Sequence, residues 1–141
     1  MAATRTANAH WEGSLLEGRG RVSLDSSGIG AYDVSWPART EEPNGVTSPE
    51  ELIAAAHSTC FSMSLSNVLS KAGHQVERVD TKADVTFQPG QGITGVALTT
   101  RASVPGISPE EFAIRAEEAK TSCPVSQALG GTTITLDAAL A

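Results

Sequence analysis

Two cysteines are the residues of this sequence with the most distinctive chemistry. Cys60 and Cys123 lie far apart along the chain, so they form neither a CxxC redox motif nor a paired zinc knuckle. A redox role needs a thiolate, a cation that stabilises it, and a second thiol that releases the oxidised sulfur as a disulfide. The alternative is that each thiol is an inert, small hydrophobic group in a buried helix.

The two cysteines differ in their predicted local surroundings. Cys123 stands directly before Pro124, at the expected start of a short helix, where the helix dipole favours a thiolate. Cys60 lies about three turns inside a longer predicted helix, so a lowered thiol pKa there requires a nearby arginine. Local electrostatics alone therefore favour Cys123 as the more acidic thiol.

His57 precedes Cys60 by three residues, which places both side chains on one face of a helix. The imidazole could act as a base, or it could bind zinc together with the two cysteines. A fourth ligand with suitable spacing is missing from the sequence, which argues against zinc. A packed or hydrogen-bonded core histidine is the other interpretation.

Glu50 and Arg39 each have a structural explanation as well. Glu50 belongs to Ser-Pro-Glu-Glu at 48–51, and the same tetrapeptide recurs at 108–111, where helix initiation alone explains it. Arg39 falls in a segment that we expect to be a polar loop, residues 37–47, where an arginine is by default a solvated surface charge.

The elements that must position these residues follow an α+β order. Glycine spacing predicts three short strands in an antiparallel meander before the loop, and the first tetrapeptide then begins a helix that Gly73 stops after about 24 residues, roughly 36 Å. A hairpin, a second helix, a helical turn and a last strand follow. The predicted ranges are 10–17, 19–25 and 31–36 for the meander, 49–72 for the long helix, 76–87 and 93–104 for the hairpin, 109–120 for the second helix and 132–140 for the last strand.

Length and composition predict one globular domain over residues 1–141, with residues 1–9 as a mobile N-terminus. The net charge is −6 and the cations are scattered, which argues against nucleic acid and anionic membrane as partners. The most apolar stretch, 52–69, is interrupted by polar residues and indicates a buried helix rather than a membrane span. Residues 1–10 contain no apolar signal segment, so we expect a cytoplasmic protein with reduced thiols.

Three segments resemble the OsmC branch of the OsmC/Ohr hydroperoxide reductases. They are SPEELI at 48–53, AAHSTCFSM at 55–63 and CPVSQAL at 123–129. His10-Trp11-Glu12-Gly13 and Val104-Pro105-Gly106 are also similar to that branch. The likeness spans nearly the whole chain, and two separated cysteine motifs in the correct order make it specific.

The resemblance implies a cysteine-based peroxidase that reduces organic hydroperoxides, and hydrogen peroxide less well, without a metal or organic cofactor. By motif match, Cys60 would be the peroxidatic thiolate, Cys123 the resolving thiol, Arg39 the cation that activates Cys60, and Glu50 the residue that orients Arg39. An external dithiol would reduce the resulting disulfide, and lipoyl-bearing proteins are the reductant expected in this family, more for its Ohr branch than for the OsmC branch. The implied fold is an intertwined homodimer in which antiparallel sheets wrap long central helices and the active sites lie at the interface.

Two points stay open within that resemblance. The segment between Arg39 and Ser48 is a residue longer than the family pattern, and Arg19 is a competing arginine. Glu50 and Cys60 are separated by roughly 15 Å and 80° on a continuous helix. The sequence therefore raises the hypothesis that Glu50 is donated in trans, near Arg39 and Cys60 of the other chain.

Two other functions remain as alternatives. A thiol redox sensor would form the Cys60–Cys123 bond once and act through a protein partner, without turnover. A hydrolase or transferase would use Cys60 with His57 as its base. For the peroxidase, Phe61 and Met63 are the expected lining of an apolar substrate entrance.

Overall fold

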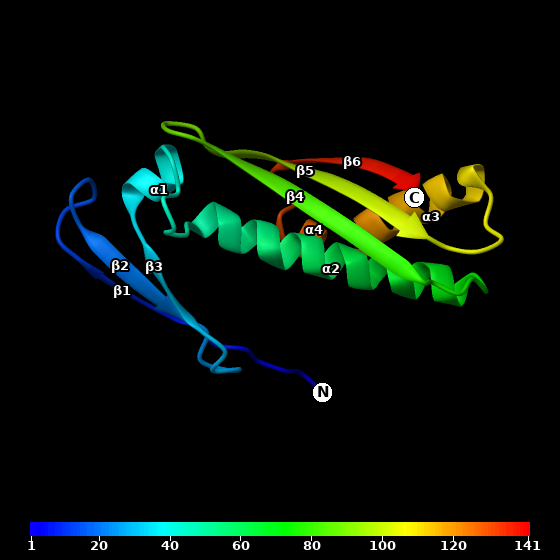
Figure 1. Ribbon diagram of the computed structural model, residues 1–141, viewed down its shortest axis with the longest axis horizontal. Helices are drawn as coiled ribbons and strands as arrows, with labels where there is room; N and C mark the ends of the chain where they lie inside the picture. Colours follow the sequence, from blue (N-terminus) through cyan, green and yellow to red (C-terminus); the bar gives the residue numbers. More distant parts are fainter. The chain divides into compact units, whose positions relative to one another are not determined.

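The computed structural model describes all 141 residues, and Figure 1 shows its elements in chain order. They are β1 (Asn8–Glu12), β2 (Arg19–Ser23), β3 (Ala31–Val34), α1 (Trp36–Thr40), α2 (Pro49–Lys71), β4 (Arg78–Gln88), β5 (Gly92–Ser103), α3 (Pro109–Ser122), α4 (Pro124–Ala128) and β6 (Thr133–Leu140). The chain divides into two compact units, Met1–Leu52 and Ile53–Ala141, which are described in turn. The order confirms the α+β class.

The first unit contains the predicted antiparallel meander, in the order β1-β2-β3. Gly20 on β2 faces Trp11 on β1, and a Cβ at this glycine would lie only 2.6 Å from the indole ring. A side chain at position 20 would therefore push the tryptophan off the sheet. β1 begins at Asn8, inside the segment 1–9 that the sequence predicts to be mobile.

A short helix, α1, replaces the start of the loop predicted for residues 37–47. Ser35 caps it, because the Ala38 amide donates a hydrogen bond of 3.2 Å to the Ser35 hydroxyl. Pro37 fits the first turn, where no amide hydrogen is needed. The cap and the proline are visible in the sequence, and they could have predicted this helix. Its last turn carries Arg39.

Helix α2 begins and ends as predicted. The Glu51 amide donates to the Ser48 hydroxyl at 3.2 Å, which caps the first turn. At the other end Gly73 adopts a φ of +89°, and the His74 amide bonds to the Leu69 carbonyl at 3.0 Å. This left-handed glycine closes the helix in a Schellman-type arrangement.

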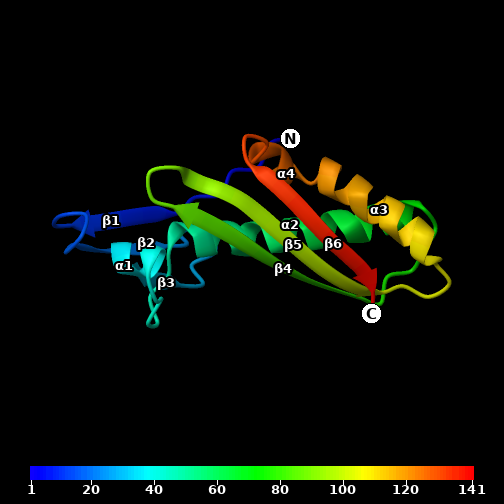
Figure 2. The same cartoon turned by 90° about the horizontal axis from the view of Figure 1, so that it is seen from above.

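The second unit contains a mixed sheet in the order β4-β5-β6. β4 and β5 form the predicted hairpin, but β6 pairs with β5 in parallel, so the expectation of purely antiparallel sheets is wrong for this strand. A parallel partner needs a crossover connection, and α3 and α4 supply it between β5 and β6. Figure 2 shows β4, β5 and β6 side by side, with α3 beyond β6.

The core of the second unit lies between its sheet and its helices. Every second residue of β4 is half-buried, and Val96 and Leu98 of β5 are fully buried, as expected for strands with one face on a core. Helix α2 contributes Phe61 and Leu65, and α3 contributes Phe112. By length and composition α2 could also cross a membrane, with a mean hydropathy of 1.2, but long core helices of globular proteins meet that criterion too.

Candidate active site

The structure brings the two cysteines together within the second unit. Cys60 lies midway along α2 and is partly exposed, whereas Cys123 is fully buried at the N-cap of α4. Cys60 packs against the buried cluster that contains Cys123, and each thiol lies close enough to shift the pKa of the other. The fold therefore makes neighbours of two thiols that are far apart in the sequence.

The pKa values of the two thiols shift in opposite directions. Burial is the largest cause and raises the pKa of Cys60; a hydrogen bond from the Val125 amide acts against it, Cys123 raises the pKa further, and Ser64 has the smallest, lowering effect. Burial also acts to raise the pKa of Cys123, but hydrogen bonds from the Ser126 amide and hydroxyl, and from Cys60, outweigh it and lower the value. Within this unit Cys123 is the more acidic thiol, as its place at a helix start predicts.

Arg39 and Glu50 form a two-pronged ion pair within the first unit. The Arg39 Nε donates to both carboxylate oxygens, at 2.9 and 3.0 Å, and Nη2 lies 2.9 Å from Oε2. The Arg39 guanidinium also stacks over the Trp36 ring, 5.7 Å from its centroid. The Glu50 side chain is only 8% exposed and that of Arg39 28% exposed. The expectation of a solvated Arg39 is wrong, because the Glu50 carboxylate and the Trp36 ring hold its guanidinium.

This geometry changes the hypothesis about Glu50. Both partners of the ion pair belong to the same chain and the same unit, so Glu50 does not need a second chain to reach Arg39. Arg19, the competing arginine, is exposed at the start of β2, where its cross-strand neighbour is Glu12. Of the two arginines, Arg39 is the one that Glu50 holds in place.

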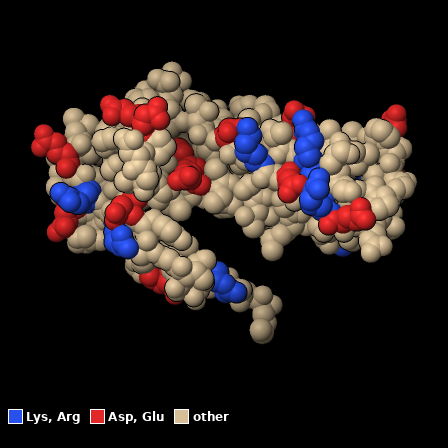
Figure 3. All heavy atoms as spheres, viewed as in Figure 1, with Lys and Arg blue, Asp and Glu red and all other residues tan.

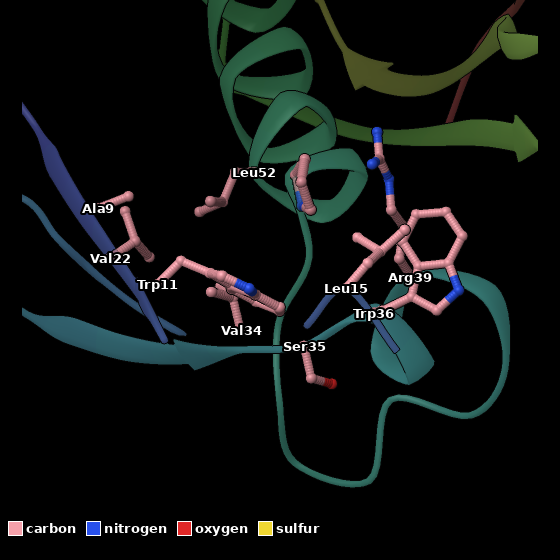
Figure 4. A pocket seen from close by; sticks show the side chains of 10 residues that line it. Ala9, Trp11, Leu15, Val22, Val34, Ser35, Trp36, Arg39 and Leu52 are labelled. Carbon is pink, nitrogen blue, oxygen red and sulfur yellow. The ribbon is translucent and has the colours of Figure 1, made fainter. Parts of the chain in front are cut away.

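An apolar hollow of about 390 Å³ opens beside Arg39 in the first unit. Figure 4 shows Trp11, Val22 and Val34 from the meander on one side and Leu52 from the first turn of α2 across from them, with Arg39 near Trp36 and Leu15. The hollow thus presents apolar side chains with one guanidinium at its edge. By contrast, Phe61 is fully buried in the core, so the expectation that it lines a substrate entrance is wrong, while Met63 is 69% exposed.

His57 is fully buried, and its Nε2 lies 2.8 Å from the Ser126 hydroxyl on α4. Burial lowers the pKa of the imidazole, which keeps it neutral. The structure thus pairs His57 with Ser126 rather than with Cys60, and the interpretation of His57 as the base for Cys60 is not supported. Ser126 was missed in the sequence, although its place three residues after an N-cap cysteine indicates a side chain close to that sulfur.

Two further expectations concern metals and surface charge. No group of three or more His, Cys, Asp or Glu residues could hold a metal ion. On the face drawn in Figure 3, lysine and arginine side chains lie among aspartate and glutamate side chains and form no continuous basic patch.

Comparisons with known proteins agree with the resemblance seen in the motifs. Residues 42–137 match the family described as OsmC-like protein. A protein of Escherichia coli K12 named Peroxiredoxin OsmC is 42% identical over 140 residues, covering 97% of this chain and 96% of its own. Organic hydroperoxide resistance proteins of Legionella pneumophila and Elizabethkingia anophelis have similar structures. Both give a TM-score of 0.73, at 25% and 27% identity, and the matches cover 98% and 100% of this chain and 99% and 100% of theirs.

The chain therefore belongs to the OsmC-like family. Within that family it is an enzyme of the peroxiredoxin type, a cysteine-based peroxidase. The family, the α+β fold and the enzyme class expected from the sequence are all confirmed.

Proposed function

We propose that this enzyme reduces organic hydroperoxides to alcohol and water, with Cys60 as the peroxidatic residue and Cys123 as the resolving residue. The observation that carries the proposal is the proximity of the two thiols, one partly exposed and one buried. The partly exposed thiol can meet a peroxide, and the buried one is already next to it for the second step.

The reaction runs in three steps. The Cys60 thiolate attacks the distal peroxide oxygen, the O–O bond breaks, and the alkoxide leaves and takes up a proton, which gives the alcohol and a Cys60 sulfenic acid. The Cys123 thiolate then attacks the sulfenic sulfur, the S–O bond breaks, and hydroxide leaves as water after protonation. An external dithiol reduces the resulting disulfide and restores both thiols.

Cys60 needs a cation for the first step, because burial and Cys123 both raise its pKa. Arg39 is our candidate, since Glu50 holds its guanidinium in a fixed orientation. The guanidinium would stabilise the thiolate and then the charge that develops on the departing alkoxide. Glu50 is a positioning residue in this scheme.

The Arg39–Glu50 pair and Cys60 come together between two chains. Glu50 and Cys60 are ten residues apart on the unbroken helix α2, about 15 Å along its axis. The apolar hollow beside Arg39 would be covered by helix α2 of a second copy, whose exposed face carries Ala55, Thr59 and Met63 next to Cys60. We therefore assign the whole ion pair to the partner's site in a homodimer.

The test of the peroxidase compares cumene hydroperoxide and hydrogen peroxide as substrates, with dihydrolipoamide as the reductant. Wild type should turn over many times and prefer the organic peroxide. Cys60→Ser should lose the peroxide reaction altogether, whereas Cys123→Ser should consume one equivalent and stop at the sulfenic acid. Loss of the first equivalent in Cys123→Ser alone would reverse the assignment of the two thiols. A single oxidation of wild type without recycling would indicate a redox sensor.

The test of the shared site mixes two inactive chains, Arg39→Ala and Cys60→Ser. In a heterodimer with the ion pair donated in trans, one of the two sites contains both an intact Arg39 and an intact Cys60, so about half of the activity per dimer should return. If Arg39 acts within its own chain, neither site of the heterodimer is complete and the activity does not return. Homodimers of each variant, measured separately, provide the baseline.

The reductant and the compartment complete the proposal. A dithiol such as a lipoyl-bearing protein would regenerate the enzyme, and a cycle that starts from two free thiols needs a reducing compartment such as the cytoplasm. Dihydrolipoamide and a thioredoxin-type dithiol supplied at equal concentration would identify the better donor.

A further inference from the structure

The reaction above makes no use of His57, although it is among the most deeply buried polar residues of the second unit. Its Nε2 lies 2.8 Å from the Ser126 hydroxyl, and its Nδ1 is buried without any hydrogen-bond partner. An unpartnered buried N–H group is rarer and costlier than an unpartnered acceptor nitrogen. We therefore place the proton of the neutral imidazole on Nε2, which donates to the Ser126 oxygen.

This tautomer fixes the direction in which the Ser126 hydroxyl can donate. A hydroxyl has one hydrogen, and its oxygen already accepts from His57, so the hydrogen is available to another acceptor. Cys123 precedes Ser126 by three residues in the first turn of α4, which places the two side chains side by side. Cys123 makes no regular capping hydrogen bond to this short helix, but the Ser126 amide and hydroxyl both act on its sulfur and lower its pKa.

Within one chain, no charged side chain is among the causes of the shift at Cys123, and in the proposed dimer the partner's Arg39 and the partner's Glu50 would lie at Cys60. Cys60 is the titratable group that faces Cys123, and neither a carboxylate, a lysine nor an arginine contributes to the titration of Cys123 or His57. Burial alone accounts for the lowered pKa of His57, so the imidazole stays neutral and acts as a donor rather than as a base.

We propose that His57 and Ser126 form a buried hydrogen-bond chain, from imidazole to hydroxyl to sulfur, that stabilises Cys123 as a thiolate and so directs the reducing dithiol to the Cys60 sulfur. His57 and Ser126 are positioning residues for Cys123. The inference rests on the proposed function, because it concerns the reduction of the disulfide which that function forms.

The chemistry of the reducing step supports this direction of attack. A thiolate of the dithiol attacks Sγ of Cys60, the disulfide bond breaks, and the electron pair leaves with Sγ of Cys123. The second thiol of the reductant then closes a disulfide on the first and releases the Cys60 thiolate. Exchange is faster when the leaving thiol has the lower pKa and the attacked sulfur is accessible. Cys123 is the buried, more acidic partner, and Cys60 is partly exposed.

The first experiment measures the pKa of Cys123 from the pH dependence of its alkylation rate, in a Cys60→Ser background where Cys123 is the sole thiol. Ser126→Ala should raise that pKa by about one unit, the size expected for one hydrogen bond to a charged sulfur. His57→Phe should raise it by less, and it should add nothing in the Ser126→Ala background, because the imidazole acts through the hydroxyl.

Conservative variants separate this role from a structural one. Ser126→Thr keeps the hydroxyl and His57→Gln keeps an N–H donor, so both should retain most of the lowered pKa. Ser62→Ala is the matched control, since Ser62 donates to Thr81 at 2.8 Å in the same unit and is not among the groups that shift the pKa of Cys123. The hydrogen-bond chain would be overturned if Ser62→Ala shifted the pKa of Cys123 as much as Ser126→Ala does, or if Ser126→Ala did not shift it.

The second experiment locates the attacked sulfur. The wild-type disulfide is formed with diamide rather than with a peroxide, then treated briefly with glutathione, quenched in acid and mapped by peptide mass. The adduct should be on Cys60, and reduction should be roughly threefold slower in Ser126→Ala. An adduct on Cys123 would overturn the inference. Because neither experiment uses peroxide turnover, a failure of the proposed peroxidase reaction would be seen separately.

Discussion

The two compact units bury very different amounts of apolar surface. In Met1–Leu52, Ala38 is the single buried hydrophobic residue, while Trp11, Leu15, Leu16, Ile29 and Tyr32 stay exposed. In Ile53–Ala141 a continuous core joins the sheet to its helices. A segment of about fifty residues with so little buried surface is not expected to be stable without a covering surface. We therefore expect the first unit to need a covering surface more than the second unit does.

The same division separates the chemical groups of the site. The sulfur atoms belong to the unit with its own core, and the Arg39–Glu50 pair belongs to the unit without one. If a second copy covers the first unit, the enzyme has its activating cation only when it is assembled. Peroxidase activity and dimer formation should then be lost together.

The largest expected effect is the fall in activity when the activating cation is removed. Arg39→Ala should lower kcat/KM for cumene hydroperoxide by roughly 10²–10³-fold, as when a fixed donor to developing charge is removed. The fold should survive, because the core lies in the other unit. Stopped-flow peroxide kinetics and circular dichroism on the same samples measure the two outcomes.

Two variants control this prediction. Arg19→Ala removes an exposed arginine of the same unit and should leave kcat/KM unchanged. Arg39→Lys should not restore the activity, since an ammonium group cannot reproduce the two-pronged contact with Glu50. A strong effect in Arg19→Ala with a weak one in Arg39→Ala would transfer the role to Arg19.

An intermediate effect is expected when a charge is placed in the hollow of the first unit. Leu15 lines that hollow and is 56% exposed, so Leu15→Glu should cost a lone chain little. If a second copy of the chain covers the hollow, the same change buries a carboxylate. The dissociation constant of the dimer should then rise roughly tenfold or more. Sedimentation velocity across a dilution series measures this.

The matched control is Ile114→Glu, on α3 of the second unit, where the isoleucine is 65% exposed. It should change neither dimerisation nor activity. The argument for a covered first unit would fail if the wild-type chain sedimented as a monomer at all concentrations. It would also fail if Leu15→Glu and Ile114→Glu weakened the dimer equally.

Capping and glycine signals made most of the elements predictable from the sequence. Ser48 and Ser108 with the prolines after them begin α2 and α3, and Gly73 ends α2, because these features act over one helical turn. The direction of β6 was not predictable in the same way. It depends on how a long crossover returns to the sheet, which no local pattern determines.

The resemblance proposes the residues of the site, but the sequence does not predict their contacts. The resemblance selected Cys60, Cys123, Arg39 and Glu50, and the structure places them as two pairs, one in each unit. The partner of His57 was not predictable, because Ser126 lies on an element far along the chain and no spacing rule connects the two. Likewise Phe61 is next to Cys60 in sequence but points into the core, since neighbours on a helix face different directions.

The smallest expected effect uses the repeated Ser-Pro-Glu-Glu tetrapeptide, which begins one helix in the first unit and one in the second. Each serine accepts a hydrogen bond from the amide three residues on, at 3.2 Å for Ser48 and 3.1 Å for Ser108. Ser48→Ala and Ser108→Ala should therefore each cost about 1 kcal/mol of stability, a decrease in Tm of a few degrees. Differential scanning calorimetry measures both.

The two substitutions should differ in their effect on activity. Glu50, in the tetrapeptide at 48–51, is buried against Arg39. Glu110, the equivalent residue of the tetrapeptide at 108–111, is exposed. Fraying the first turn of α2 loosens the orientation of the guanidinium, so Ser48→Ala should lower kcat/KM at temperatures where the chain is still folded, while Ser108→Ala should leave it unchanged. Equal activity in the two variants would mean that Glu50 is held by the ion pair itself and not by the cap. In that case Glu50→Gln, which weakens the ion pair but keeps the helix start, should lower activity while the cap variants do not.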